Sequence, residues 1–460
     1  MNMSAESGKG LPLYVKILIG LLIGGAIGLT VNYLGLSKSP EPPAVASQIQ
    51  TVVIGAIKYI AEPIGKIFLR LILMVVIPLV FSALVLGVVG VGDVRKLGRV
   101  GLKTLVITLI LSVTAVGVGV GLVNLIKPGA SLSEEKREEL KARYAKDAQK
   151  SLDNAEKAKA KTAVDRVVDM LPENPLAEMV GALNGKSDGN GMLAVMFFAL
   201  LVGIAMSILG EQAKPLTDVL QVTFDICMVI ISWAMAIAPI AVACLVFSMT
   251  ANLGFAIIGT LARFVVTVML GLTLHLVVVY SLVLIGIGRK SPIAFFRQVV
   301  QAMLTAFGTS SSNASLPTAM RVADEELKLP QSISRFVLTV GATGNQNGTA
   351  LYEGVVVLFL AQLFGVDLTT TQQVTVVLMS VLAGIGTAGV PGGSIPVIVL
   401  LLQSVGVPGE SIGIILGIDR ILDMSRTVLN VTGDLVVAQC VASWEEKGLS
   451  PSPNGPTAAL

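Results

Sequence analysis

The chain has 460 residues, of which 53% are hydrophobic and 14% are charged, with a formal net charge of +3 and a single histidine. A soluble chain usually carries about 25% charged residues, so this balance argues against an ordinary cytosolic enzyme, a disulfide-rich secreted domain and a disordered protein. The net charge is too small for a nucleic-acid-binding surface, and the three cysteines form no metal-binding motif, so we expect an all-α protein that crosses a membrane several times.

Apolar stretches long enough to cross about 30 Å of hydrocarbon predict about eight transmembrane helices. They lie at residues 17–36, 67–93, 104–126, 191–210, 217–249, 256–288, 336–364 and 411–441. We expect the first to be a retained helix, not a cleaved signal peptide. Short basic loops at 95–103 and 289–297 predict a cytoplasmic side that also holds both termini. Residues 131–165 form a densely charged insertion, expected outside the cell as a solvated helix or mobile loop.

Two further apolar segments are too short to cross. The first leads from QVVQAMLTAF into the polar tip GTSSSNASLP, and the second leads from VTVVLMSVLAG through IGTAGVPGGS into IPVIVLLLQ. Arms of about ten residues around such tips predict re-entrant helical hairpins. Two interrupted segments in matching positions are typical of secondary transporters with inverted repeats. The alternative is a pair of ordinary helices with flexible loops.

The last apolar helix carries a polar stripe. Its members fall within a sector of about 80°, at 100° per residue: Asp419, Asp423, Arg426, Asn430 and Asp434. Ionised groups that face lipid cost about 3 kcal/mol or more each, so the stripe is expected to face a cavity or protein partners. Because Arg426 is expected to neutralise only one of three carboxylates, the surplus acid predicts bound cations. The alternative is a structural ion-pair network between helices.

The segment TVGATGNQNGTALYEG, residues 339–354, interrupts another apolar stretch. Gly, Asn and Thr weaken a helix there and leave carbonyl oxygens free, which are the ligands that hard cations prefer. Asn345 can add a side-chain oxygen. The alternative is a structural kink.

Four ordered motifs resemble those of one family: TSSSNASLP from Thr309, GNQNGTALYE from Gly344, GIGTAGVPGG from Gly384 and DRILDMSRTVLNVTGD from Asp419. Together with residues 74–101 they are similar to the dicarboxylate/amino acid:cation symporter family, which includes glutamate/aspartate and neutral amino-acid transporters. The resemblance implies a homotrimer whose transport domain slides like an elevator past a scaffold. It further implies that residues 1–288 are mainly scaffold and trimerisation helices with some transport-domain contribution, that 289–443 form the transport-domain core, and that 444–460 form a cytoplasmic tail.

The resemblance also implies roles for individual residues. Asp423 would bind the substrate amino group, Arg426 the side-chain carboxylate and Asn430 the α-carboxylate. Thr349 would support the side-chain end, and Ser312 with the tip backbone would complete the cradle. The second hairpin would be the extracellular gate. The implied substrate-binding set is Ser311, Ser312, Thr349, Val390, Gly392, Asp423, Arg426, Thr427 and Asn430.

The coupling ion implied by the resemblance is sodium, with no organic cofactor. One ion would lie at Asp434 and Asn430, and a second would lie among backbone carbonyls once the second hairpin closes. The implied ligands are Gly341, Thr343, Asn345, Gly384, Ile385, Thr387, Asn430 and Asp434. Family members driven by protons tend to lack a carboxylate at the position of Asp434, which favours sodium here.

The sequence departs from the family pattern at its usual Asn-Met-Asp triplet, which is Asn345, Gln346 and Asn347 here. Leu111 likewise replaces a hydroxyl ligand beside Ser112. Because a hard-cation site weakens when it loses an anionic ligand, we expect coupling to about two sodium ions where relatives use three.

Two charged residues remain as candidates for specific roles. Glu353 matches the carboxyl that animal glutamate transporters use for proton coupling, so it is the candidate proton carrier. Arg420 is a candidate for a positive charge that relatives carry elsewhere, and a simple ion-pair role is equally open.

These features favour a sodium-driven importer of aspartate or glutamate in the cell membrane. A guanidinium grips a carboxylate in a bidentate way, and Asp423 would lack a cation if the ligand were a plain dicarboxylate. The alternatives are a C4-dicarboxylate or neutral amino-acid symporter and, in another class, an anion channel on the same scaffold. An enzyme is disfavoured, because no GxSxG surrounds the serines and the lone histidine has no recognisable acid partner in sequence.

Overall fold

The computed structural model describes residues 13–34, 51–90, 94–143, 171, 173–181, 192–386 and 392–449. Within these ranges the chain is helical and contains no strand, which confirms the all-α class. The first half comprises α1 Leu13–Tyr33, η1 Ile57–Ala61, α3 Glu62–Leu73, α4 Val76–Gly90, α5 Val94–Ile126, η2 Pro128–Ser131, α6 Glu134–Arg143, α9 Pro175–Gly181, α10 Met192–Leu209, η3 Gly210–Ala213 and α11 Lys214–Leu253. The second half comprises α12 Phe255–Leu274, η4 His275–Val279, α13 Tyr280–Val283, η5 Leu284–Gly288, α14 Pro292–Thr309, α15 Ser312–Glu325, α16 Gln331–Gly344, α17 Asn347–Leu363, α18 Thr370–Gly386, α19 Ile395–Ser404, η6 Gly409–Ile414 and α20 Leu416–Leu449.

Each of the eight predicted apolar stretches contains helix in the structure. By length and composition, five stretches of the described chain can cross a membrane: Val15–Tyr33, Thr51–Val89, Val100–Ala130, Ala194–Asn252 and Phe255–Gly288. They cover the first six predicted stretches, because Ala194–Asn252 includes both α10 and α11. The last two predicted stretches are not among these five. The seventh is interrupted by the helix break, and the eighth carries the polar stripe, which lowers its hydropathy. The number of membrane crossings stays a prediction.

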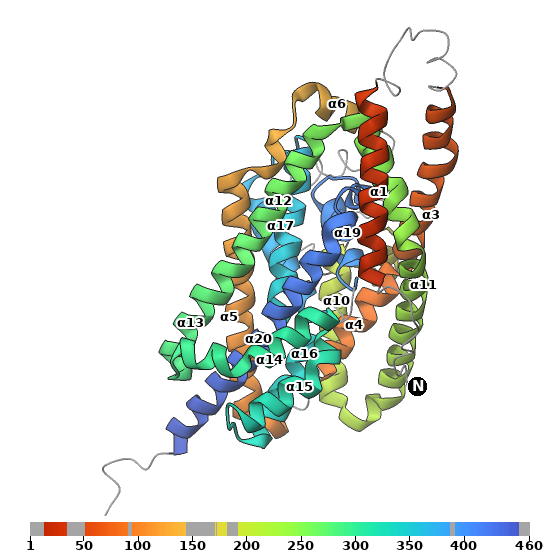
Figure 1. Ribbon diagram of the computed structural model, residues 1–460. Coiled ribbons are helices and arrows are strands. Elements are labelled where there is room, and N and C mark those ends of the chain that lie inside the picture. Colours follow the sequence, from red (N-terminus) through yellow and green to blue (C-terminus); the bar gives the residue numbers. More distant parts are fainter. Residues whose placement is uncertain are drawn as a thin grey trace, which may run out of the picture.

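A row of glycines brings α1 against α11 along their length (Figure 1). A Cβ at Gly20 would collide with the carbonyl oxygen of Pro239, and one at Gly24 with that of Ala243. A Cβ at Gly28 would come 2.6 Å from the carbonyl oxygen of Phe247. Small residues at a spacing of four allow two helix backbones to approach this closely, as in other membrane helix pairs.

Each of the two segments predicted to be hairpins contains two helices that pack against each other. In the first, α14 and α15 pack together around Ser310, which adopts a left-handed conformation with φ of 51°. Its first arm has 18 residues and is longer than the arm of about ten that the sequence predicted, because it starts at Pro292. In the second, α18 and α19 pack together, and residues 387–391 of the tip lie outside the described residues. Their depth in the membrane stays a prediction.

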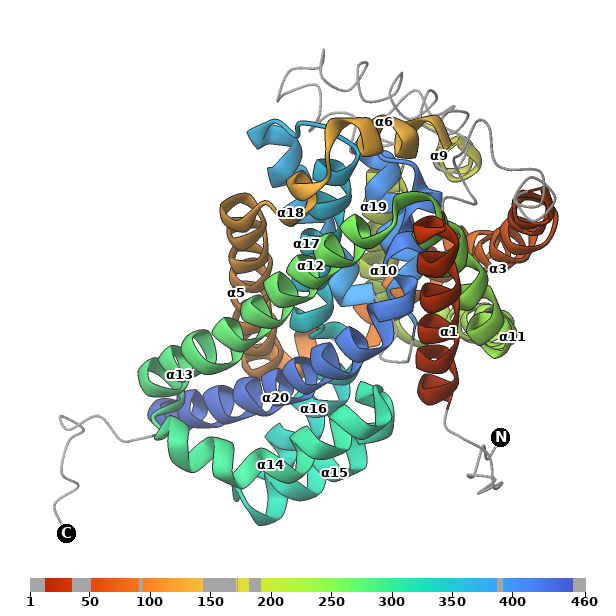
Figure 2. The same ribbon diagram turned by 45° about the horizontal axis from the view of Figure 1, so that its top comes forward.

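The two hairpins reach the centre of the molecule from opposite ends. Figures 1 and 2 both place α14 and α15 toward the lower end and α18 and α19 toward the upper end, with α20 crossing between them. Helices α16 and α17 also pack on α20, and α5 packs along α17. The broken helix, the two hairpins and the polar helix α20 therefore meet in one region.

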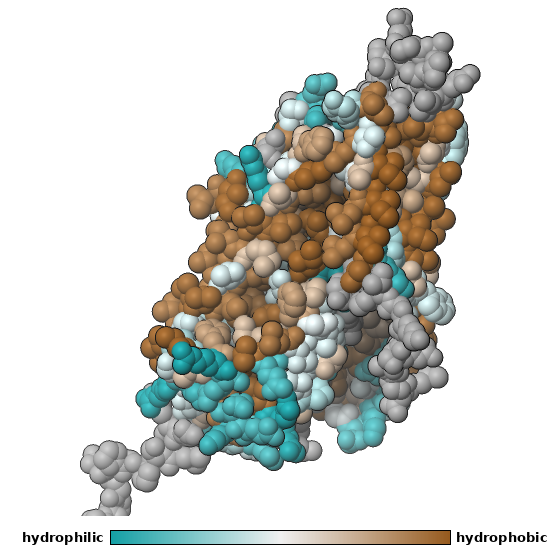
Figure 3. All heavy atoms as spheres, viewed as in Figure 1, coloured by the Kyte–Doolittle hydropathy of each residue, from teal (hydrophilic) through white to brown (hydrophobic). Residues whose placement is uncertain are grey.

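The surface is apolar over a broad belt. Large hydrophobic side chains are exposed on α1, α5, α11 and α12, including Trp233, Leu22 and Val266. Figure 3 shows this belt across the middle, with hydrophilic residues gathered at the lower end over the first hairpin. A contiguous apolar surface of this extent is typical of a membrane protein. Of the charged insertion, α6 is helical, and residues 144–165 lie outside the described part.

Candidate functional site

The polar stripe of α20 lies inside the protein. Asp419 is 7% exposed, Arg426 is 1% exposed and Asp434 is 3% exposed. The helix has few charged residues outside the stripe until its last turns, so burial of this face leaves its polar groups to be satisfied by neighbouring elements. Two groups of contacts result, one at each end of the stripe.

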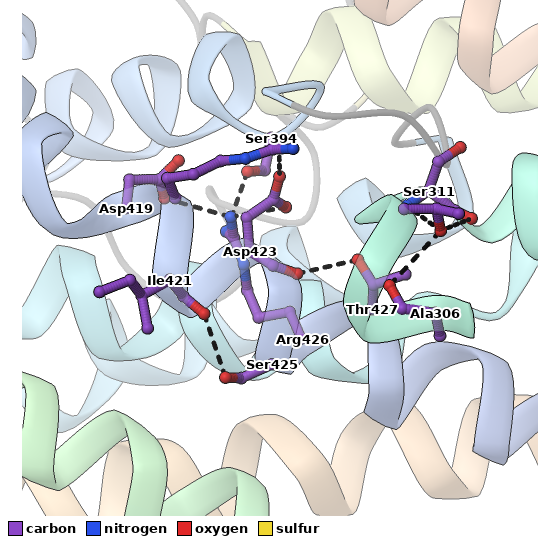
Figure 4. Close-up of polar contacts among 11 residues, drawn as sticks. Ala306, Ser311, Ser394, Asp419, Ile421, Asp423, Ser425, Arg426 and Thr427 are labelled. Atoms are coloured by element: carbon purple, nitrogen blue, oxygen red, sulfur yellow. Dashed lines mark hydrogen bonds and ion pairs between the residues drawn. The ribbon is translucent and has the colours of Figure 1, made fainter. Parts of the chain in front are cut away.

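A charged cluster occupies the first end (Figure 4). Arg426 Nη2 lies 3.1 Å from Asp419 Oδ1 and 2.9 Å from Asp423 Oδ1. Its Nη1 donates a 3.0 Å hydrogen bond to Ser394 Oγ, which comes from the second hairpin. The guanidinium carbon lies 3.9 Å from the ring centre of Tyr352 on α17, a cation–π contact. Four side chains from three elements therefore hold this arginine.

Arg426 carries one positive charge, as expected, but it contacts two carboxylates, and a second arginine supplies the other positive charge at this end of the stripe. The Arg426 guanidinium contacts both Asp419 and Asp423, and Arg420 Nη1 lies 3.6 Å from Asp423 Oδ2. The sequence reasoning assigned one partner to each charge, whereas a guanidinium offers five donors in a planar fork. Two arginines and two aspartates thus form a balanced cluster, and Arg420 has the ion-pair role.

The break between α16 and α17 joins several elements. Asn345 and Gln346 leave the helical conformation, with ψ values of 67° and 57°. Asn345 Nδ2 donates to Asp434 Oδ1 on α20 at 2.8 Å, and Gln346 Nε2 donates to Ser312 Oγ in the first hairpin at 3.3 Å. Asn347 Nδ2 donates to the hydroxyl of Tyr280 at 3.1 Å. Three successive amides therefore contact three different elements.

Asn430 lies between the charged cluster and Asp434. Its Oδ1 accepts a 2.7 Å hydrogen bond from the backbone N–H of Gly348, and its Nδ2 donates to Gln346 Oε1 at 2.5 Å and to Thr349 Oγ1 at 3.1 Å. A Cβ at Gly348 would come 3.1 Å from Asn430 Oδ1. Only glycine therefore allows the start of α17 to approach this amide.

The second end of the stripe contains Asp434. A Cβ at Gly341 would collide with its carboxylate, so the end of α16 lies directly against it. A cavity of about 30 Å³ borders Asp434 and Asn345, and α5 contributes Thr104 and Thr108 to its wall. Asn345 Oδ1 is buried and has no hydrogen-bond partner within the described residues. A carboxylate and an unused amide oxygen at one cavity are suitable ligands for a hard cation.

The remaining predicted residues are placed as follows. Ser311 caps α15 by accepting a 3.2 Å hydrogen bond from the N–H of Ala314, and Thr427 Oγ1 bonds the carbonyl of Asp423 at 2.8 Å. Gly392, with φ of 77°, interacts through its backbone N–H with Asp423.

The second predicted sodium site is only partly described. A Cβ at Gly384 would come 3.4 Å from the carbonyl oxygen of Gln346, which places α18 against the helix break. The side chain of Thr343 is exposed, and its carbonyl is the predicted ligand. Ile385 lies in α18, and its side chain is outside the described set. Thr387 and Val390 lie outside the described residues.

Glu353 is fully buried in α17, one residue after Tyr352, and its charge interacts with that of Arg426. The two arginines and two aspartates of the charged cluster balance one another, and Glu353 is a fifth ionisable side chain beside them. An ionised Glu353 would therefore give this region a net negative charge inside the protein, which is costly without a counter-charge.

The sequence reasoning missed Ser394, Gln346, Tyr352 and Tyr280 as members of the site. Gln346 stood in the segment already identified as a break, so its position was a usable signal. A tyrosine in an apolar helix is a weaker signal, namely a hydroxyl that requires a partner. Elsewhere in the described chain, no group of three or more His, Cys, Asp or Glu residues could hold a metal ion.

Comparison with known proteins agrees with this geometry. The model of the sodium:dicarboxylate symporter family matches residues 13–444. The chain belongs to the sodium:dicarboxylate symporter family. It is 33% identical to the proton/sodium-glutamate symport protein of Bacillus caldotenax, over 94% of both chains.

Two further relatives show the breadth of the family. The proton/glutamate-aspartate symporter of Escherichia coli K12 is 33% identical over 84% of this chain and 85% of its own. The human excitatory amino acid transporter 2 is 32% identical over 94% of this chain and 79% of its own. This member of the family is thus a multi-pass membrane transporter and not an enzyme.

Proposed function

We propose that this sodium:dicarboxylate symporter imports aspartate or glutamate together with sodium. The observation that carries the proposal is the placement of a buried arginine cluster and a buried, separate carboxylate on one face of α20. Arg426 and Asp434 are eight residues apart, about two helical turns. The first can hold an anionic substrate, and the second can hold its accompanying cation.

An acidic amino acid fits the charged cluster by exchange of ion pairs. Its amino group would bind Asp423, and its side-chain carboxylate would bind Arg426, whose Nε is buried and has no partner within the described residues. Each aspartate or arginine released from the internal pair then gains a ligand partner of the opposite charge. A C4-dicarboxylate brings no cation for Asp423 and a neutral amino acid brings no carboxylate for Arg426, so both fit less well.

Sodium fits the other end of the stripe. Asp434 has Asn345 as its hydrogen-bond donor and, among the residues that the structure describes, no arginine partner, and the adjacent cavity of about 30 Å³ offers room for a small ion. The Gly341 carbonyl, Asn345 and Asn430 would complete this site. The second sodium would bind where α18 lies against the helix break, at the carbonyls of Thr343, Gly384, Ile385 and Thr387.

Two sodium ions agree with the contacts of Asn347. Its Oδ1 accepts from Ser112 Oγ at 2.7 Å and its Nδ2 donates to Tyr280, so both polar atoms already have protein partners. A third ion at this residue would have to displace a hydrogen bond without gaining a carboxylate.

The proposed organisation follows the family. Residues 289–443, with contributions from earlier helices, would form the moving transport domain of a homotrimer, and the second hairpin would be its gate. Both termini would face the cytoplasm, with 444–460 as a tail. Glu353 would carry a coupled proton, because protonation removes the excess negative charge beside Arg426.

Uptake of labelled aspartate into liposomes that contain the purified protein tests the proposal. We expect uptake with an inward sodium gradient and none when choline replaces sodium. Liposomes loaded with unlabelled aspartate should accumulate external label by counterflow, whereas an anion channel would not sustain that exchange. Uptake that is indifferent to choline would refute sodium coupling, and preference for succinate or alanine would favour an alternative substrate class.

The reversal potential of aspartate flux decides the ion number. At a fixed aspartate gradient, the voltage that stops net flux depends on the charge moved with each substrate. We expect a value that corresponds to about two sodium ions per aspartate, and a value that requires three would contradict the assignment of Asn347 as a non-ligand.

A further inference from the structure

A chain of four hydrogen-bonding groups runs through the core beside the site. Ser112 Oγ on α5 donates to Asn347 Oδ1 at 2.7 Å, and Asn347 Nδ2 donates to Tyr280 Oη at 3.1 Å. The Tyr280 hydroxyl in turn donates to the carbonyl oxygen of Leu429 on α20 at 3.0 Å. The direction of donation is the same at each step. The chain therefore links α5, α17, α13 and α20.

The end of this chain lies between two functional residues. Leu429 immediately precedes Asn430, and Gly433 immediately precedes Asp434. A Cβ at Gly433 would collide with Tyr280 Oη and would come 3.1 Å from Asn347 Nδ2. The tyrosine hydroxyl thus rests on the backbone of α20 between the substrate end and the cation end of the polar stripe.

Tyr280 is itself held in place from several sides. Its side chain is fully buried, and its ring makes an edge contact with His275, with ring centres 4.9 Å apart and planes at 75°. His275 begins the π-helical segment η4, and Tyr280 follows that segment directly. Short π-helical segments shift the face that a helix presents, and they are frequent at functional sites. Here the shift coincides with the residue that points its hydroxyl at α20.

We propose that Tyr280 is a positioning residue of the transport site, which fixes α20 against the helix break so that the substrate and cation ends are aligned together. This inference rests on the proposed function. Asn347 transmits the constraint because it shares the break with Asn345, the partner of Asp434, and with Gly348, the partner of Asn430. Loss of the hydroxyl would leave Asn347 Nδ2 without this acceptor and would remove the side-chain hydrogen bond to the Leu429 carbonyl, so both ends of the stripe would lose this link to the helix break.

Tyr280→Phe removes only this hydroxyl and is the decisive variant. We expect the sodium concentration for half-maximal aspartate binding to rise about tenfold, because one buried hydrogen bond and its alignment are lost. The maximal transport rate at saturating sodium should change less than about twofold, since the residue touches neither ligand. Isothermal titration of aspartate into purified protein at graded sodium concentrations gives the first quantity, and liposome uptake gives the second.

Thr267→Val is the matched control. Thr267 is a fully buried hydroxyl of α12 that donates to the carbonyl of Arg263 in its own helix at 2.7 Å. Its loss should leave the sodium dependence of binding unchanged. A general effect of a missing buried hydroxyl would move both variants alike and would overturn the positioning role.

Ser112→Ala tests the other end of the same chain. We expect a rise in half-saturating sodium of about threefold, and a double variant no worse than Tyr280→Phe alone, because the groups act as one unit. If Tyr280→Phe does not elute as folded protein in size-exclusion chromatography, Ser112→Ala decides. Sodium dependence within twofold of the wild type in a folded variant overturns the inference, whereas a wild type that binds no aspartate in sodium overturns the proposed function instead.

Discussion

The two ends of the polar stripe on α20 solve the problem of buried charge in different ways. At Asp423 and Arg426 the protein supplies its own counter-charges, so two arginines and two aspartates balance one another. At Asp434, eight residues after Arg426, the hydrogen-bond donor among the described residues is an amide, that of Asn345. A substrate at the first end would have to exchange partners with the internal ion pairs. At the second end no described arginine or lysine pairs with Asp434, so we expect a cation to complete it.

This difference predicts different ligands at the two ends. An internal ion pair can be replaced by a zwitterion that presents both charges, at little net electrostatic cost. A carboxylate and an amide oxygen at the edge of a small cavity favour a cation that binds through oxygen. The following substitutions separate the two ends, in order of decreasing expected effect.

Arg426→Ala should have the largest effect, because it removes the group proposed to bind the substrate carboxylate and leaves Asp419 and Asp423 with a deficit of positive charge. We expect aspartate affinity to fall about 100-fold or more, and small neutral amino acids to become better ligands relative to aspartate. Competition binding measures both. Arg335→Ala, at an arginine whose side chain is 62% exposed, is the control. Unchanged aspartate affinity in Arg426→Ala would reject the assigned role.

Asp434→Asn should act on the cation end while keeping the side-chain shape. We expect half-saturating sodium for aspartate uptake to rise at least about tenfold, because the anionic ligand is lost. Aspartate binding at very high sodium should weaken less. Asp367→Asn changes an exposed carboxylate and should match the wild type. Equal sodium dependence in both variants would show that Asp434 binds no cation.

Glu353→Gln should alter the pH dependence of uptake. If a proton moves inward with substrate, wild-type uptake falls as the outside pH rises from about 6 to 8, because fewer carriers are protonated. The glutamine variant resembles the protonated form, so its uptake should be nearly flat over that range. Initial rates measured at fixed inside pH give the comparison. A wild type that is already flat, or a variant that keeps the slope, removes Glu353 as the proton carrier.

Ser394→Ala should have the smallest effect, since it removes one hydrogen bond between the second hairpin and Arg426. We expect this bond to favour the substrate-free carrier, in which Arg426 would keep its internal partners. We expect net uptake to slow about threefold and aspartate exchange to stay unchanged, because exchange does not require the empty carrier to return. Slowing of exchange by the same factor would assign Ser394 to substrate binding instead.

The sequence predicted the features that depend on local pattern. Apolar runs gave the helices, the polar tip at Ser310 and Ser311 gave the first hairpin, and the period of 3.6 residues placed Asp423 and Arg426 on one face. The hydrogen-bond and ion-pair partners of these residues could not be predicted, because they depend on which helices meet in space. Arg426 binds two carboxylates and Ser394, and nothing near it in the sequence indicates the hairpin serine.

Other contacts arose from packing that leaves a weak trace in one sequence. Tyr352 lies under the guanidinium because α17 passes α20, and Tyr280 reaches Leu429 across 149 positions of chain. The glycines of α1 lie in an ordinary hydrophobic run, and the sequence alone does not show that they contact the backbone of α11. The functional break at Asn345 was visible because three amides cannot remain in lipid without partners.

The glycine contacts between α1 and α11 have a mechanical consequence. Backbone carbonyls of α11 sit where side chains of α1 would otherwise begin, so the pair cannot rotate or shift by a turn without a steric clash. The two helices therefore keep one relative position and would move, or stay in place, as a single unit during transport, and a methyl group added at Gly24 would force their backbones apart.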